Sequence, residues 1–208
     1  GSLEVKDISI PKAAIEAAGL TLNLLGQEMV KDMLPKRGLN THKGSFGSVF
    51  VAACSKGMEG SGIMASIAAL KSGAGTVLLG MPESLQKPMF YGALEIMTTG
   101  LPDKGTGILS EECIPKLMEQ AYKSSVMLAG PGLTHSNSIR AIMQDIIQKC
   151  NVPAIIDADG LNAIAENPEV LKKRSCEIAI TPHPGEMARL CGVSSRDIQR
   201  DRLGYAVR

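Results

Sequence analysis

Two clusters of polar residues, each directly following a short apolar run, have the types and spacing to bind a phosphate-bearing ligand. The apolar runs span residues 153–156 and 177–180 and are bounded by Pro, Gly and Asp, which is typical of buried parallel strands. The polar residues that follow them include Asp157, Asp159, Asn162, His183 and Glu186. Because open α/β sheets bind ligands at the carboxyl edge of their strands, we expect these side chains to lie close together there.

The carboxylates and the histidine each have a functional and a structural interpretation. Asp159 is expected mainly to cap the following helix, which leaves Asp157, nearer the strand end, as the candidate for a network of phosphate, Mg²⁺ and water. His183 lies between two prolines that stiffen its loop, which favours a ligand contact over a surface position without function. His42 and His135 are expected to be structural.

The tripeptide Gly130-Pro131-Gly132 lies between an expected strand and an expected helix. Glycines there let a ligand approach the backbone, and the free N–H groups of a helix start attract anions. The same turn occurs in α/β proteins without any ligand, so both interpretations stay open. Lys43, in a basic and glycine-rich stretch, is a candidate phosphate contact or else a solvated lysine.

Length, charge and cysteine usage argue against several classes of protein. The chain has 208 residues, enough for one large domain, and its net charge of +1 gives no electrostatic footprint for nucleic acid or an anionic membrane. Its five cysteines are widely spaced without a C-x-x-C pair, which predicts reduced thiols in the cytoplasm and neither a disulfide framework nor a metal site. No apolar stretch is long enough to span a bilayer. We therefore expect a protein that binds small molecules.

Strands and helices are expected to alternate along the chain. We expect strands at residues 49–53, 76–79, 93–97, 126–129, 153–156 and 177–180. We expect one or two helices within 12–34 and further helices at 61–72, 81–90, 110–121, 139–147, 185–190 and 194–208. This alternation predicts an α/β fold with a doubly wound, mostly parallel sheet flanked by helices.

Five motifs, in this order, resemble those of the ADP- or ATP-dependent NAD(P)H-hydrate dehydratases, members of the ribokinase-like superfamily. They are His42-Lys43-Gly44-Ser45-Phe46-Gly47, Lys71-Ser72-Gly73-Ala74-Gly75, Gly130-Pro131-Gly132-Leu133, Asp157-Ala158-Asp159-Gly160-Leu161-Asn162 and Thr181-Pro182-His183-Pro184-Gly185-Glu186. The resemblance implies a ribokinase-like three-layer domain at 35–208. The preceding helical segment, 1–34, resembles the linker from the epimerase domain of bifunctional members.

The resemblance also implies an activity and its ligands. Family members repair hydrated NADH and NADPH: ADP or ATP with Mg²⁺ phosphorylates the hydroxyl of the hydrated ring, and phosphate then leaves. The residues implied by position to contact the hydrated dinucleotide are Ser61, Gly132 and His183. Those implied in the phosphate and magnesium-water network are Asp157, Asn162 and Glu186. Small-molecule nucleotides are therefore the expected partners.

The chain departs from the family in several places. It has Ala53-Cys54-Ser55 where the family usually has Gly-Gly-Ser, which would alter how closely a ligand approaches the backbone, and Ser61 stands where the family usually has Ala. The family's catalytic base and much of its nucleotide site lie in segments expected beyond Arg208, so no residue of this chain is implied to be catalytic. We expect the C-terminal strands and helices to be absent, the chain to have little or no activity by itself, and exposed sheet edges to favour a homo-oligomer.

Two other functions remain open from the sequence. Another ribokinase-like kinase, acting on a vitamin precursor or a sugar alcohol, would share the fold, because fold alone does not fix the substrate. A non-catalytic nucleotide-binding fragment would keep the polar edge and lack the base. The sequence of residues 181–186 favours the dehydratase over the other kinases.

Overall fold

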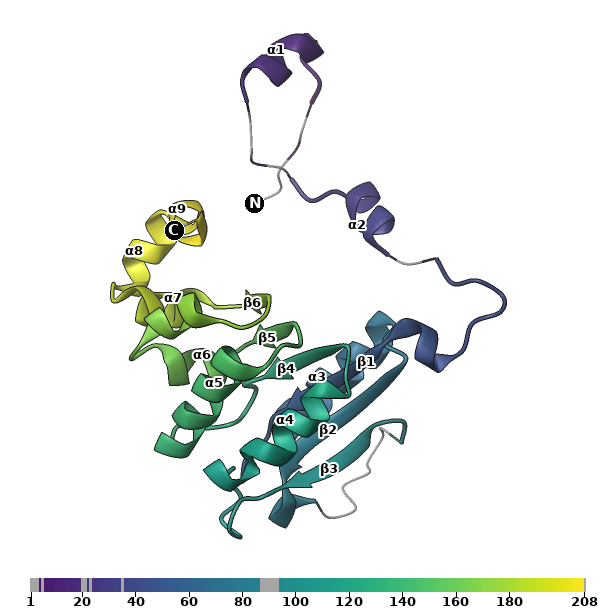
Figure 1. Cartoon of the computed structure of the whole chain (residues 1–208). Helices are drawn as coiled ribbons and strands as arrows, with labels where there is room; N and C mark the ends of the chain where they lie inside the picture. Colours follow the sequence, from purple (N-terminus) through teal and green to yellow (C-terminus); the bar gives the residue numbers. More distant parts are fainter. Residues whose placement is uncertain are drawn as a thin grey trace. The chain divides into compact units, whose positions relative to one another are not determined.

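The chain separates into two compact units, Gly1–Thr41 and His42–Arg208. The computed structural model describes residues 4, 6–19, 22, 24–34, 36–86 and 94–207. The first unit contains helices α1 (Lys12–Ala17) and α2 (Gln27–Met33), whose residues are all exposed (Figure 1). Gly19, with φ of 59°, follows α1 and interrupts the helical stretch expected within 12–34. The linker role of this segment stays a prediction.

The second unit is built on a six-stranded parallel sheet (Figure 1). Its strands are β1 (Ser48–Ala52), β2 (Thr76–Pro82), β3 (Met97–Leu101), β4 (Val126–Ala129), β5 (Ala154–Ile156) and β6 (Ile178–Ile180). They lie in the order β3-β2-β1-β4-β5-β6. This order confirms the predicted doubly wound α/β fold and places the reversal of strand order between β1 and β4. Ligands of such sheets bind outside the carboxyl ends of the strands at that point.

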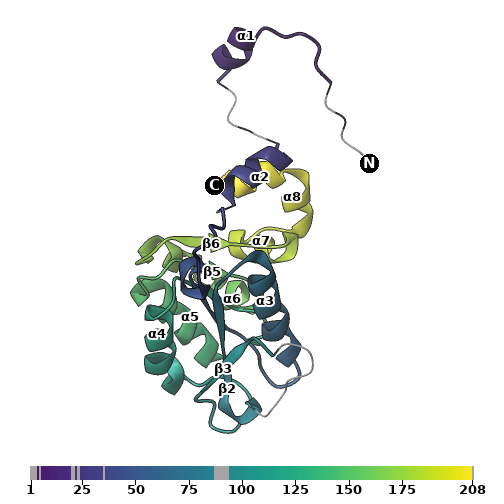
Figure 2. The same cartoon turned by 90° about the vertical axis from the view of Figure 1, so that its right-hand side faces the viewer.

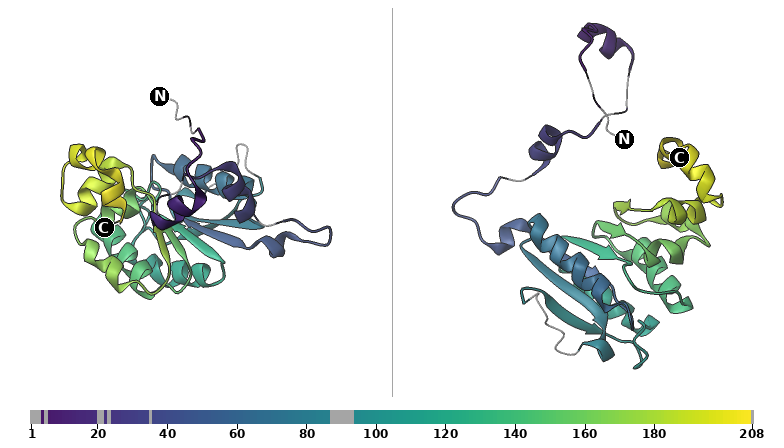
Figure 3. Two further views of the ribbon diagram at one scale, coloured as in Figure 1. Left: turned by 90° about the horizontal axis from the view of Figure 1, so that it is seen from above. Right: turned by 180° about the vertical axis from the view of Figure 1, so that it is seen from behind.

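Helices cover the two faces of the sheet in separate layers. Helix α3 (Glu59–Ser72) packs on one face, and α4 (Ile114–Tyr122), α5 (Asn137–Lys149) and α6 (Asp159–Ile164) pack on the other. Figure 2 shows α3 on one side of the sheet and α4 and α5 on the opposite side, and the right-hand view of Figure 3 has α3 in front of β1 and β2. The remaining elements are α7 (Pro184–Cys191), α8 (Ser195–Arg200), α9 (Arg202–Val207) and the 3-10 helices η1 (Lys43–Phe46), η2 (Glu83–Leu85), η3 (Glu111–Cys113) and η4 (Pro168–Lys173).

Apolar spacing explains the layer formed by α5. The helix carries apolar residues at i, i+3, i+4, i+7 and i+8, all of them buried: Ile139, Ile142, Met143, Ile146 and Ile147. This stripe belongs to the same core as Phe50 of β1 and Met127 of β4, whose side chains are fully buried. The helix predicted from this pattern is therefore confirmed.

Small residues bring α3 close to the other face of the sheet. A Cβ at Gly62 would lie 2.5 Å from Cys54 Sγ and 2.8 Å from Leu79 Cδ1, so the helix backbone itself touches the strands. Gly73 ends the helix in the left-handed conformation. On this same face Ile155 of β5 is 37% exposed. Apolar surface of this kind is what the predicted homo-oligomer would cover, and the oligomer stays a prediction.

The helix expected at 81–90 is wrong in its described part. Strand β2 continues through Pro82, and the 3-10 helix Glu83–Leu85 follows it, whereas residues 87–90 lie outside the described part of the chain. Hydrogen bonding to a neighbouring strand extends β2, because Gly80 to Pro82 pair with β3. Long-range pairing of this kind overrides local composition.

The strand expected at 93–97 is displaced toward the C-terminus. Strand β3 begins at Met97 and ends at Leu101, so most of the predicted strand lies before it, and residue 93 itself lies outside the described residues. Thr98 and Thr99 form the middle of β3 and pair with β2. Both are β-branched, which suits a strand. The error arose because the more apolar stretch before them looked the better strand.

The stretch predicted as one helix at 194–208 forms two helices. Between α8 and α9, Asp201 has φ of −144° and ψ of 60°, which is not helical. Its carboxylate accepts a hydrogen bond from the Gly204 N–H (3.0 Å), so Asp201 stops α8 and caps α9. Among the helices of the described residues, none is long and apolar enough to cross a membrane.

Candidate functional site

The loops that follow β1 and β4 meet where the strand order reverses. The Cys54 N–H donates a hydrogen bond to the Pro131 carbonyl oxygen (3.0 Å). The Ser61 hydroxyl reaches the same carbonyl oxygen (3.0 Å) and also that of Met58 (2.8 Å). The structure thus brings Ser61 next to the turn that contains Gly132. A substrate contact was predicted for both residues, and that contact stays a prediction.

Both glycines of the Gly130-Pro131-Gly132 turn are required by the protein's own packing. Gly130 has φ of 130°, and a Cβ there would overlap the Asp157 carbonyl oxygen. Gly132 has φ of 65°, and a Cβ there would overlap the Ser61 hydroxyl. Neighbouring loops therefore explain why glycine stands at both positions, where the sequence also suggested the approach of a ligand.

The departure from Gly-Gly-Ser puts a cysteine in the left-handed region of backbone conformation. Cys54 has φ of 77°, and its thiol donates to the Glu59 carbonyl oxygen (3.2 Å). Burial raises the pKa of the Cys54 thiol to about 11, so the thiol is protonated near neutral pH. The next residue, Ser55, is 1% exposed, and its hydroxyl has no hydrogen-bond partner among the residues that the structure describes.

The two aspartates after β5 have separate roles, one of which differs from the prediction. Asp159 was predicted to cap α6, but the N-cap is Ala158, whose φ is 50°. The Asp159 carboxylate instead accepts a hydrogen bond from the Thr134 N–H (2.9 Å), which ties the loop after β4 to the loop after β5. The Asp157 carboxylate makes no hydrogen bond or ion pair with any described residue. Asp157 is therefore the carboxylate that a ligand or its water shell could use.

His183 and Glu186 form a capping box at the start of α7. His183 Nδ1 accepts hydrogen bonds from the N–H groups of Gly185 (2.9 Å) and Glu186 (3.3 Å), which assigns the ring proton to Nε2. Glu186 is 6% exposed, its Oε2 accepts from the His183 N–H (2.8 Å), and its Oε1 lies 3.2 Å from His183 Nε2. The His183 side chain is 62% exposed. Glu186 thus orients a histidine whose ring a ligand can reach.

The ends of β5 and β6 bring Asp157 and His183 to one edge of the sheet. Ile156 and Ile180 are partners across the two strands, and the Thr181 N–H donates to the Ile156 carbonyl oxygen (3.3 Å). Asp157 follows Ile156 directly, and His183 follows Ile180 after Thr181 and Pro182. Ser61 and Gly132 lie nearby, where the strand order reverses between β1 and β4. The carboxyl edge thus brings together four of the seven predicted site residues, and Glu186 contacts His183.

Asn162 lies on the outer side of this edge. Its side-chain oxygen accepts a hydrogen bond from Arg189 Nε (2.8 Å), which joins α6 to α7. Asn162, Arg189, His135 and Glu166 line a separate open cavity of about 440 Å³. His135 Nε2 lies 3.8 Å from Asp159 Oδ1. Asn162 Nδ2 donates to Asp159 Oδ1 (3.4 Å), and the predicted role of Asn162 in a phosphate network, which would use this amide nitrogen, stays a prediction.

Lys43, the remaining predicted residue, does not join the others. It begins η1, directly before β1, so it lies at the amino edge of the sheet. A Cβ at Gly75, directly before β2, would overlap the Lys43 carbonyl oxygen, which shows how closely the two segments pack. The glycine-rich sequence around Lys43 is therefore explained by close packing of the segments before β1 and β2, at the edge of the sheet opposite to His183 and Gly132.

Asp103 is an ordered carboxylate that the sequence interpretation missed. It is fully buried and accepts hydrogen bonds from the N–H groups of Gly107 (2.8 Å) and Gly105 (3.2 Å) and from the Ser84 hydroxyl. Burial raises the pKa of Asp103, but the hydrogen bonds from Ser84, Gly107 and Gly105 outweigh it and leave the pKa below its usual value. The sequence interpretation placed the preceding strand at 93–97, too early to bring Asp103 to a strand end.

Replacing Asp103 with asparagine is expected to lower the free energy of unfolding by about 1–3 kcal/mol at neutral pH, because a buried charge-assisted hydrogen-bond acceptor is lost. A carboxyl group with a lowered pKa stabilises the fold above its unfolded pKa of about 3.9, and this contribution disappears as the pH falls through the folded pKa. Urea unfolding of wild type and Asp103→Asn at pH 7 and at about pH 3 measures both effects. An equal difference at the two pH values would contradict this account.

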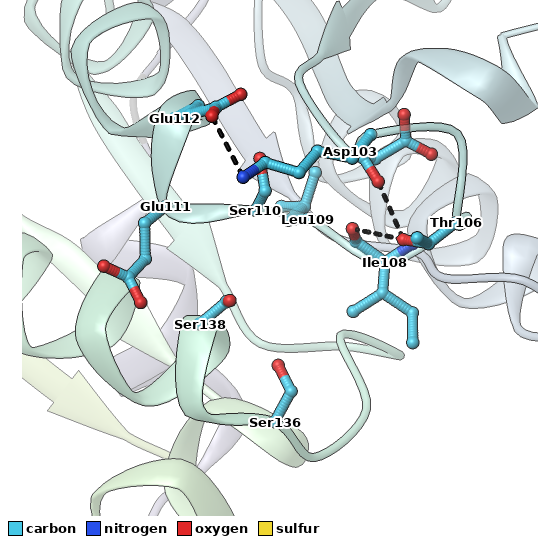
Figure 4. Close-up of a pocket in the computed structure, with 10 residues that line it drawn as sticks. Asp103, Thr106, Ile108, Leu109, Ser110, Glu111, Glu112, Ser136 and Ser138 are labelled. Atoms are coloured by element: carbon cyan, nitrogen blue, oxygen red, sulfur yellow. Dashed lines mark hydrogen bonds and ion pairs between the residues drawn. The ribbon is translucent and has the colours of Figure 1, made fainter.

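A cavity of about 560 Å³ lies between the segment after β3 and the start of α5 (Figure 4). The polar groups at its wall are hydroxyls and carboxylates, from Thr106, Ser110, Glu111, Glu112, Ser136 and Ser138. Lys104 Nζ is paired with Glu112 Oε1 at 3.0 Å. The volume is that of a small-ligand site. The excess of carboxylates over cations makes it a poor place for phosphate, and the sequence did not predict it.

Comparison with known proteins relates this geometry to one family. The profile described as NAD(P)H-hydrate dehydratase (Carb_kinase) matches residues 49–208. The bifunctional NAD(P)H-hydrate repair enzyme Nnr of Moorella thermoacetica is 37% identical over 208 residues, which are 100% of this chain and 39% of that protein. The ADP-dependent (S)-NAD(P)H-hydrate dehydratase of Bacillus subtilis is 28% identical over 180 residues, 86% of this chain and 60% of that protein.

A solved structure agrees with these sequence matches. The ADP/ATP-dependent NAD(P)H-hydrate dehydratase from Bacillus subtilis, co-crystallised with ATP and Mg²⁺, superposes with a TM-score of 0.68 at 26% identity. The match covers 87% of this chain and 60% of that chain. The chain thus spans between 39% and 60% of the length of these relatives. Because the family profile covers residues 49–208, including the whole carboxyl edge described above, the chain belongs to the NAD(P)H-hydrate dehydratase family.

Proposed function

We propose that the carboxyl edge of this sheet binds hydrated NADH or NADPH, and that the chain contributes this site to an ADP- or ATP-dependent NAD(P)H-hydrate dehydratase. The observation that carries the proposal is the family match over 49–208, which includes Ser61, Gly132, Asp157 and His183 on one edge. The relatives that bear this activity in their names are longer than the chain, so the activity, the nucleotide donor and Mg²⁺ belong to the proposal.

His183 and Asp157 are the two residues proposed to meet the ligand directly. The His183 side chain is 62% exposed, and its Nε2, which lies 3.2 Å from Glu186 Oε1, is proposed to donate to the hydroxyl or phosphate of the hydrated dinucleotide. The carboxylate of Asp157 has the oxygen chemistry that Mg²⁺ prefers, and Mg²⁺ usually keeps several waters and binds few carboxylates. Bound Mg²⁺ would neutralise charge on the transferred phosphoryl group. One free carboxylate at this edge fits such a water-mediated contact.

Ser61 and Glu186 are proposed to act through their neighbours. The Ser61 hydroxyl is engaged by two carbonyl oxygens, and it packs against Gly132. Both carboxylate oxygens of Glu186 face His183. Phosphoryl transfer depends mostly on positioning and electrostatic stabilisation, so residues that hold the turn and the histidine still in this way serve the proposed reaction.

Titration calorimetry with hydrated NADH tests this proposal on the chain and on His183→Asn. Asparagine keeps the N-cap acceptor of α7 but is too short to present the Nε2–H. We expect affinity to fall about tenfold, as for the loss of one hydrogen bond to the ligand. The matched control, His135→Asn, alters an exposed histidine of the neighbouring loop and should change affinity by less than about twofold. Equal losses in both variants, or no binding by the wild-type chain, would overturn the proposed site.

A further inference from the structure

We propose that the 102–110 loop, built around buried Asp103, positions the Gly130–Gly132 turn of the proposed substrate site. Asp103 is in this view a positioning residue that acts through the segment 54–58. The site assignment rests on the proposed function, whereas the mechanical connection rests on contacts between three loops at the carboxyl edge.

The first step is that Asp103 fixes the shape of its own loop. Three of the five residues 103–107 have positive φ: Lys104 (54°), Gly105 (73°) and Gly107 (77°), a conformation that glycine adopts readily and that strains Lys104. The Asp103 carboxylate collects the N–H groups of both glycines. The loop is closed by Ser110, whose N–H and hydroxyl both reach the Pro102 carbonyl oxygen (3.0 and 3.1 Å). The hydrogen bonds to the buried Asp103 carboxylate therefore fix the backbone conformation of the loop.

The second step joins this loop to the segment after β1. The Lys56 N–H donates to the Gly107 carbonyl oxygen at 2.8 Å. A Cβ at Gly107 would lie 2.7 Å from Lys56 Cβ, so the two backbones touch and leave no room for a side chain. The position of Gly107, which Asp103 sets, thereby fixes the position of Lys56.

The third step carries the position of 54–58 to the turn. At one end of the segment, Cys54 N–H holds the Pro131 carbonyl oxygen. At the other end, the Met58 carbonyl oxygen accepts from Ser61 and would lie 3.0 Å from a Cβ on Gly132. The segment 54–58 therefore contacts the Gly130–Gly132 turn through both of its ends, while its middle residue, Lys56, is hydrogen-bonded to Gly107. A shift of Lys56 must move the turn or break one of these contacts.

Two glycines of the same loop separate this role from ordinary loop stability. Gly105 and Gly107 both have positive φ, so alanine strains the backbone at either position. A Cβ at Gly105 has no described heavy atom within 4 Å, whereas one at Gly107 pushes directly on Lys56. Gly105→Ala is therefore the matched control for Gly107→Ala.

The test is amide hydrogen exchange by NMR combined with titration of hydrated NADH. In Gly107→Ala we expect the Lys56 and Cys54 amides to exchange at least about tenfold faster than in Gly105→Ala, because their acceptors are displaced. We expect affinity for hydrated NADH to fall about tenfold in Gly107→Ala and less than about twofold in Gly105→Ala. Ser84→Ala, which removes one donor to Asp103, should act in the same direction more weakly and serves if Gly107→Ala does not fold.

Equal exchange at Cys54 in the two alanine variants would overturn the connection between the loops. Faster exchange with unchanged affinity would overturn the positioning role and leave the loop structural. If the wild-type chain does not bind hydrated NADH, the proposed function fails, and the exchange rates of Lys56 and Cys54 still decide whether the loop holds the turn.

Discussion

Replacing Gly130 with alanine is expected to destabilise the chain by about 3 kcal/mol or more. The backbone at Gly130 has φ of 130°, a conformation that costs a residue with a Cβ about 1–3 kcal/mol. The added methyl would also overlap the Asp157 carbonyl oxygen, and overpacking of this kind costs about 1–3 kcal/mol. Because the whole domain is stable by only about 5–15 kcal/mol, urea unfolding should show a midpoint far below that of the wild type.

Gly192→Ala provides the control for the steric part of this effect. Gly192 also has positive φ, 65°, but a Cβ there would have no described heavy atom within 4 Å. We expect a loss of about 1 kcal/mol, from backbone strain alone. Equal losses at Gly130 and Gly192 would show that the loops after β4 and β5 do not pack as described.

Replacing Glu186 with alanine is expected to have the second largest effect and to weaken binding as well as folding. The buried carboxylate accepts from the His183 N–H and faces His183 Nε2, so its loss removes the capping box and frees the histidine ring. We expect the free energy of unfolding to fall by about 2 kcal/mol, as for a buried hydrogen bond to a charged group. Affinity for hydrated NADH should fall about tenfold, because His183 is no longer held in one orientation.

A second capping box separates these two consequences. At the start of α8, the Asp197 carboxylate accepts hydrogen bonds from the N–H (3.2 Å) and hydroxyl (2.6 Å) of Ser194, away from the carboxyl edge. Asp197→Ala should lower stability by about 1 kcal/mol and leave affinity within about twofold of wild type. Calorimetric titration and urea unfolding of both variants measure the difference. Weakened binding in Asp197→Ala as large as in Glu186→Ala would argue that general loosening, and not His183, controls affinity.

The elements predicted well are those whose own residues carry a strong local pattern. Strand β4 was placed at its observed bounds, and α5 followed from five apolar residues at helical spacing, all of them buried. The doubly wound fold followed from the alternation of such segments. The positions of β3 and of the end of β2 could not be read locally, because both depend on pairing between Gly80–Pro82 and Thr99–Leu101.

The location of the site could be predicted from the sequence, but the contacts of its individual residues could not. Asp157 and His183 were placed at the ends of β5 and β6, and the structure has them at one edge. Glycine types alone could not show that Gly130 and Gly132 make room for Asp157 and Ser61. Such close approaches join residues far apart in the sequence.

Lys43 and Asp103 are two further residues whose surroundings could not be predicted from the sequence. Lys43 was a candidate phosphate contact from its glycine-rich neighbours; it precedes β1 at the amino edge, away from the other candidates, and its phosphate contact stays a prediction. The sequence interpretation missed Asp103 because it placed the preceding strand too early, and the partners of Asp103 include Ser84, which precedes it by nineteen positions. Had the end of β3 been predicted at Leu101, Asp103 would have been placed at the carboxyl edge. The sequence Asp-Lys-Gly-Thr-Gly at 103–107 is typical of a tight loop.

We propose that this edge recognises the hydrated form of the nicotinamide nucleotide. The most direct measurement is calorimetric titration of the chain with hydrated NADH and, separately, with NADH itself. A site that hydrogen-bonds the ring hydroxyl is left unpaired by the parent dinucleotide, so we predict that hydrated NADH binds at least about tenfold more tightly. Equal affinity for the two, or binding of neither, would contradict the account.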